Sequence, residues 1–232
     1  MKKLQLLLFV AVMVTLAIPV PSSGYSFSAY GAMTGARTLA VVPTFYVPVV
    51  PSFKASTDLV LGYGITPNFD VFADVSTLTF APTFGFTQAW IMPRYDFGNN
   101  NIAALQATLA YDAATGVSAL LAPQYHFFYE NDACALEINA IVSVPLSAPE
   151  NTVVSAIIAP VWKVVKPSFH LFVEVDPSYT FGGSFALAVV PGVCFCFADN
   201  AHQLCVGVPF MNVTSGTLST GVNVWYTGTF KI

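Results

Sequence analysis

The sequence predicts an all-β protein, a closed antiparallel transmembrane β-barrel of about 12 strands with short turns at both ends. Of 232 residues, 55% are hydrophobic and only 9% are charged, whereas an ordinary soluble domain is about 25% charged. Turn-forming clusters recur along the chain, and between them apolar and polar residues alternate with period two. Such alternation gives a strand one face for lipid and one for a barrel interior.

The N-terminus has the pattern of a secretory signal peptide. Two lysines precede the apolar stretch 4–20, and the small residues at 22–24 follow it. Two prolines near the end of the apolar stretch favour cleavage over a membrane-anchoring helix. We therefore expect a signal peptide over 1–24, an N-terminal lead-in over 25–37 and a transmembrane β-barrel over 38–232.

Eleven turn clusters divide the remaining chain into 12 predicted strands. The first strand is expected near Thr38 to Val50 and the last near Leu218 to Phe230. The clusters are 51–52, 67–68, 81–82, 98–101, 114–116, 131–132, 148–151, 166–167, 182–183, 199–202 and 214–216. All eleven connections are short, which leaves little loop material for a plug or a lid.

Charged residues fall on one face of the predicted strands. In the stretches 69–76, 136–146 and 169–181, acidic and polar side chains gather on one face and mostly apolar side chains on the other. The polar face of a membrane barrel lines the interior, because the opposite face meets lipid.

A weak repeat recurs about every 30 residues, one per predicted hairpin. Each copy begins with a proline, at 93, 123, 160 or 191, and continues into aromatic or apolar residues. A proline removes a ladder hydrogen bond, so we expect these prolines near interfaces or at bulges. We expect the aromatic residues to form a girdle at one membrane interface. They are Tyr95, Phe97, Tyr125, Phe127, Tyr129, Trp162, Phe195 and Phe197.

Two other architectures explain the hydrophobicity less well. The runs 75–93 and 177–198 carry no charge and are long enough to cross a bilayer as helices. Both contain prolines and glycines, and an interior proline costs a helix about 3 kcal/mol. A soluble lipocalin-like barrel would place apolar residues inside, which would leave this chain's exterior almost uncharged.

Two segments resemble a known class of proteins. Residues 62–72, which begin Gly-Tyr-Gly-Ile-Thr, resemble a hairpin of Gram-negative outer-membrane β-barrel proteins of the porin-like and transporter type. Residues 222–230, which end in an aromatic residue, are similar to the terminal strand that the barrel assembly machinery recognises. The resemblance implies a bacterial outer-membrane location, with the lipid bilayer and the barrel assembly machinery as partners.

The sequence offers no catalytic constellation. His126 and His170 fall on the interior face by parity, and His202 lies in a predicted turn, so none stands beside an obvious serine nucleophile. We therefore expect no enzymatic activity, no metal and no cofactor. Removal of the two N-terminal lysines leaves six basic against 12 acidic residues, a formal net charge of −6. We therefore expect no nucleic-acid partner, because nucleic acids are negatively charged as well.

Cys196 and Cys205 are candidates for a disulfide. A four-residue turn over 199–202 would place them opposite each other on a hairpin, and the periplasm is oxidising. Two free buried thiols are the open alternative. Cys134 has no assignable partner.

The leading functional hypothesis is a porin-like pore or passive solute transporter for small solutes or cations, with an acidic, cation-preferring interior. A sealed structural or adhesive barrel is the alternative, and a membrane-embedded enzyme is the third. Acidic residues outnumber Lys54, Arg94 and Lys163 among the inward-facing positions. The predicted pore-lining residues are Asp58, Asp70, Asp74, Arg94, Asp96, Asp112, His126, Glu137, Lys163, His170, Glu174 and Asp176.

Overall fold

The computed structural model describes residues 18–19, 31–51, 53–81, 84–112, 116–198, 201–214 and 218–232. The expected signal peptide lies outside these residues, apart from the two that form β1. The elements are β1 (Ile18–Pro19), β2 (Thr38–Val50), β3 (Ala55–Thr66), β4 (Phe69–Ala81), β5 (Gly85–Asp96), β6 (Asn101–Asp112), β7 (Gly116–Glu130), β8 (Cys134–Pro145), a 3-10 helix (Pro149–Asn151), β9 (Val153–Val165), β10 (Phe169–Thr180), β11 (Phe185–Phe197), β12 (His202–Gly207), β13 (Phe210–Met211) and β14 (Ser219–Lys231).

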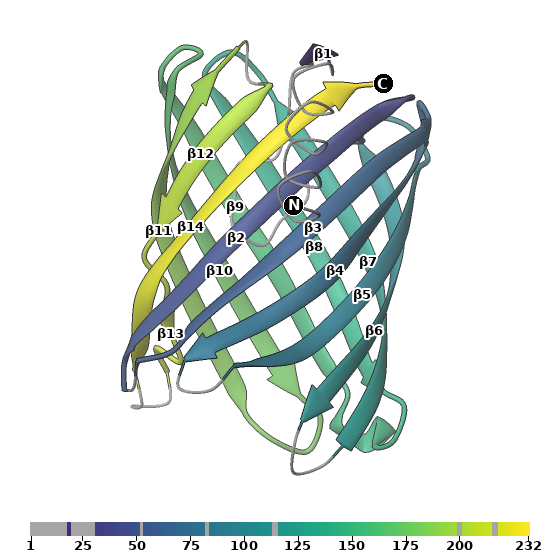
Figure 1. Ribbon diagram of the computed structural model, residues 1–232, viewed down its shortest axis with the longest axis vertical. Helices are drawn as coiled ribbons and strands as arrows, with labels where there is room; N and C mark the ends of the chain where they lie inside the picture. The colour runs from purple at the N-terminus through teal and green to yellow at the C-terminus, as the bar shows by residue number, and fades with distance from the viewer. Residues whose placement is uncertain are drawn as a thin grey trace, which may run out of the picture.

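Twelve antiparallel strands form a closed barrel in the described chain, as the sequence predicts (Figure 1). Each strand pairs with its neighbours in sequence, and β14 pairs with β2 to close the sheet. β12 and β13 act as one interrupted strand between β11 and β14. The first strand has its predicted bounds, and the last is displaced by one residue. The short β1 pairs with the end of β14.

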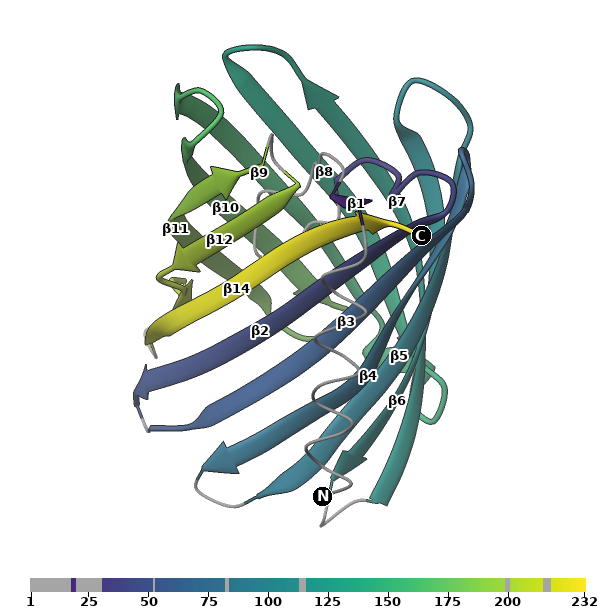
Figure 2. The ribbon, with the colours of Figure 1, turned by 45° about the horizontal axis from the view of Figure 1, so that its top comes forward.

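The two barrel ends differ in what they carry. β2 begins and β14 ends at one end, called here the proximal end, which Figure 2 turns toward the viewer. The connections 67–68, 97–100, 131–133, 166–168 and 198–201 lie there, and the others lie at the distal end. The connections fall at the predicted turn clusters, because the residues there favour turns over ladder pairing.

The barrel exterior is apolar and bordered by aromatic side chains at both ends. At the proximal end the predicted girdle residues are exposed, except for Phe127, which is half-buried. A second set at the distal end is exposed too, namely Phe53, Phe80, Phe84, Phe86, Tyr111, Tyr179, Phe181 and Phe185. Two aromatic belts around an apolar band are the exterior that a bilayer requires of a barrel.

No helix in the described residues is long and apolar enough to cross a membrane.

The repeat prolines interrupt the ladder without shifting it. Beside Pro93, Ile91 pairs with Ala107 and Arg94 with Ala104, which is the same register on both sides of the proline. The register is likewise unchanged past Pro123 and Pro160. Each proline thus removes local pairing to one neighbouring strand, and no bulge forms at these three positions.

Aromatic and aliphatic side chains pack inside the barrel in two clusters. One joins Phe128 and Phe172 to Trp225, and the other contains Phe72, Trp90 and Met92. Glycines make room for two of these rings. A Cβ on Gly62 would lie 2.5 Å from the Phe72 ring, and one on Gly192 would overlap the ring of Phe172.

Candidate functional site: the barrel interior

The structure places ten of the predicted pore-lining residues on the inner face of the strands. Their positions alternate with exposed, lipid-facing residues, as the period of a strand requires. Asp70, Asp74, Arg94, His126, Glu137, His170 and Glu174 are buried, and Asp58, Lys163 and Asp176 are half-buried.

The other two predicted residues, Asp96 and Asp112, are the last residues of their strands and lie at the barrel ends. Asp96 is the last residue of β5, and its Oδ1 accepts a hydrogen bond from the Gly98 amide at 2.7 Å, which shapes the turn. Asp112 is the exposed last residue of β6. Lys54, counted as inward-facing by parity, is exposed in the connection between β2 and β3.

Asp70 and Arg94 form a buried, bidentate ion pair across β4 and β5. They occupy opposite positions in the ladder, so both side chains reach the same interior space. Arg94 donates from Nε to Asp70 Oδ1 at 2.8 Å and from Nη2 to Oδ2 at 2.7 Å. The guanidinium also lies 4.5 Å from the centroid of the Phe72 ring, in a cation–π contact.

The same ion pair holds the end of the lead-in inside the barrel. Arg94 donates to the carbonyl oxygens of Gly31 and Ala32, at 3.3 and 3.2 Å. Asp70 accepts from the amide and the hydroxyl of Thr34, at 2.9 and 3.0 Å. The short connections predicted little material for a plug. Residues 31–34 precede the first barrel strand, and they place additional backbone inside the barrel.

A glycine of the Gly-Tyr-Gly motif makes this position of the lead-in possible. The Gly35 backbone passes so close to Gly64 that a Cβ there would overlap the Gly35 carbonyl. The Arg37 amide donates to the Gly64 carbonyl at 2.7 Å, which brings the chain to the start of β2. The motif therefore has a structural role at the proximal end.

The second interior base is also in an ion pair. Lys163 on β9 donates to Glu130 Oε1 at 2.5 Å and to the Asn131 carbonyl at 2.7 Å. This pair lies at the proximal rim, where β7 ends and the turn to β8 begins. Both basic side chains on the inner face of the described strands are thus held by a carboxylate.

Acidic side chains gather farther inside on two opposite parts of the wall. Asp58 and Asp74 lie on β3 and β4, where Asp58 accepts from the Tyr46 hydroxyl at 2.6 Å and Asp74 from Thr77 at 2.5 Å. Glu174 and Asp176 lie two residues apart on β10, on the same face of the strand.

A row of amides extends the polar interior along β6 and β7. Gln124 donates to Gln106 Oε1 at 2.9 Å, and its own Oε1 lies 2.8 Å from His126 Nε2. Gln106 donates onward to Thr108 at 3.0 Å. The period-two alternation of the sequence places these glutamines on the inner face, as it does the charged residues. The predicted pore-lining set did not include them.

The predicted disulfide between Cys196 and Cys205 is wrong, because the bond joins Cys194 to Cys205. These two residues are ladder partners with Cα atoms 4.1 Å apart, and Cys196 lies opposite Gln203. The turn spans 198–201, with Ala198 at positive φ, and not 199–202. A turn displaced by one residue moves the partner of Cys205 by two and leaves it on the same face.

Cys196 is a free, buried thiol, and its Sγ lies 3.4 Å from His170 Nδ1. Cys134 is free and half-buried at the proximal rim. No group of three or more metal-ligating side chains comes together within the described ranges.

Comparison with known proteins identifies the fold. No family model matches the sequence, and no curated protein matches it. The structure is similar to an outer membrane channel from Pseudomonas putida F1, at 13% identity and a TM-score of 0.57, over 89% of this chain and 100% of that one. It is also similar to the NanC porin, at 8% identity and a TM-score of 0.57, over 84% and 100%. The fold is that of bacterial outer-membrane barrels of the porin-like type, and the apolar, aromatic-belted exterior fits such a membrane.

Proposed function

We propose that the protein is a porin-like channel of the outer membrane whose acidic interior prefers cations. The proposal depends on one observation, that each of the two basic side chains of the interior is already paired with a carboxylate. Arg94 is held by Asp70 and Lys163 by Glu130, while the inner face of the described strands also carries Asp58, Asp74, Glu137, Glu174 and Asp176. These five additional carboxyl groups give the inner face of the described strands an acidic excess.

An acidic excess inside a barrel acts on permeating ions through its field. Side chains in a confined, low-dielectric space concentrate counter-ions and repel ions of their own sign. Carboxyl groups on opposite parts of the wall, β3–β4 and β10, would act on an ion from both sides. The fold shared with an outer membrane channel and a porin supports conduction as the purpose of the interior.

A sealed structural barrel is the second candidate, and a specific observation favours it. Residues 31–37 of the lead-in are held at the proximal end of the interior, where Ala32 packs against the cluster that contains Phe172 and Trp225. This arrangement narrows the interior there. A barrel closed by the lead-in would anchor or stabilise the membrane without transporting solutes.

The reversal potential in a KCl gradient across a planar bilayer tests the charge preference. We expect potassium to be preferred over chloride. The double variant Asp58→Asn/Asp74→Asn should lower the potassium-to-chloride permeability ratio by about twofold or more, because it removes one of the two acidic wall regions.

A matched variant controls for loss of charge as such. Asp132→Asn/Glu150→Gln also removes two carboxylates, but from exposed positions in connections outside the strands. It should leave the permeability ratio near that of the unmodified protein. Chloride preference in the unmodified protein, or equal effects of the two double variants, would contradict an acidic interior that selects cations.

A further inference from the structure

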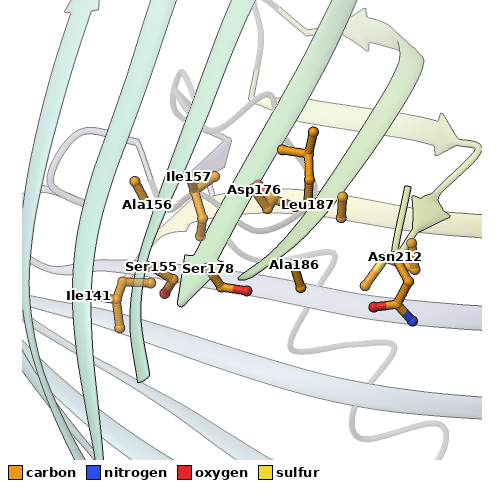
Figure 3. A pocket seen from close by; sticks show the side chains of 11 residues that line it. Ile141, Ser155, Ala156, Ile157, Asp176, Ser178, Ala186, Leu187 and Asn212 are labelled. Carbon is orange, nitrogen blue, oxygen red and sulfur yellow. The ribbon is translucent and has the colours of Figure 1, made fainter. Parts of the chain in front are cut away.

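The distal half of the interior contains a hollow of about 290 Å³ between β8, β9, β10 and β11 (Figure 3). It exists because several inward-facing residues there are small. Ala188 pairs with Asp176 across β10 and β11, and Ser155 pairs with Ser178 across β9 and β10. None of the residues that line the hollow belongs to the two aromatic clusters.

One side of the hollow is polar. Asp176 lines it, and the Oδ1 atom of this carboxyl is buried and has no hydrogen-bond partner. A buried carboxylate oxygen without a partner is costly unless a donor or a cation reaches it. Ser155 and Ser178 lie side by side nearby (Figure 3), so their hydroxyl oxygens add two acceptors on the same side.

The other side of the hollow is aliphatic. Ile141 and Ile157 line it from β8 and β9. A hydrated inorganic cation would leave these side chains against water, whereas a hydrocarbon chain would cover them and remove their apolar surface from water, which is favourable. The hollow is also far larger than a dehydrated metal ion requires.

We propose that this hollow binds small organic monocations with a primary ammonium group and a short aliphatic chain. An ammonium group has three donors, and Asp176 Oδ1 and the two serine hydroxyls offer three acceptors. The Asp176 carboxyl group lines the hollow and supplies the negative charge that balances one ammonium group. The proposal deepens the proposed function, on which it rests as an account of permeating solutes, by naming a solute class and the place that holds it.

Ligand-observed proton NMR with n-butylammonium chloride tests the site in the detergent-folded protein, and it does not depend on conduction. We expect saturable broadening of the ligand signals. Asp176→Asn should weaken binding by about tenfold, since a charge-assisted hydrogen bond is lost. Ala188→Leu should abolish binding by filling the hollow, and it keeps the carboxyl group.

Three controls give the test its specificity. Asp58→Asn removes a carboxylate from the opposite wall and should leave binding unchanged. n-Butanol, which lacks the charge, and tetramethylammonium, which lacks the donors, should bind more weakly than n-butylammonium. A heat-modifiable shift in electrophoretic mobility verifies that each variant forms a barrel.

The outcomes separate this proposal from the channel proposal. Binding that is absent, or that is the same in Asp176→Asn and Ala188→Leu as in the unmodified protein, overturns the site whatever the bilayer shows. Binding that depends on both residues, in a protein that does not conduct or that prefers chloride, establishes the site and overturns the cation channel.

Discussion

Arg94 shows what parity can and cannot predict about a single residue. Its inward position follows from the alternation of its strand, as do those of Asp70 and Asp74. Its partner does not follow, because the ion pair depends on the register between β4 and β5 and on the backbone of the lead-in. The residue spacing within one strand gives no information about the register or about the position of the lead-in. Gln106 and Gln124 lie on the inner face by the same parity, but the predicted pore-lining residues were charged residues and histidines and did not include them.

Replacing Arg94 with methionine should destabilise the barrel by about 3 to 5 kcal/mol, because Asp70 would remain buried without its partner. Urea unfolding of the protein refolded into lipid vesicles measures the free energy of unfolding. The double variant Asp70→Asn/Arg94→Met removes both charges and should recover most of the loss. If the double variant is no more stable than Arg94→Met, the loss of stability in Arg94→Met does not come from an unpaired carboxylate.

At the scale of elements, the strands and turns could be predicted closely and their pairing register could not. Turn clusters located the connections because glycine, proline, asparagine and aspartate act locally. The hairpin of β11 and β12 shows the limit. A displacement of one residue in its turn changed the partner of Cys205 from Cys196 to Cys194.

Mass mapping checks this register directly. After alkylation without reduction and proteolysis, we expect a cross-linked peptide pair that joins Cys194 to Cys205, with Cys134 and Cys196 both alkylated. The Cys196→Ser variant should retain the cross-link, and Cys194→Ser should lose it. A cross-link that survives in Cys194→Ser and disappears in Cys196→Ser would restore the pairing that the sequence suggested.

For the whole molecule, the sequence predicted the closed barrel because every backbone polar group within lipid needs a partner and period-two alternation excludes helices. Two features of the interior lay beyond it. Residues 31–37 of the lead-in are held in the barrel by contacts between residues far apart in sequence, such as Thr34 with Asp70. The distal hollow arises from small residues on several strands, which only the assembled barrel brings together.

Single-channel recording of the purified protein in planar bilayers tests the central claim, that this interior conducts. We predict discrete, reproducible conductance steps in symmetric KCl, because polar and acidic side chains extend along the inner face from the proximal ion pairs to the distal hollow. Protein that shows the heat-modifiable mobility of a folded barrel and yet gives no steps would contradict the claim, and the barrel would then be one sealed by its lead-in.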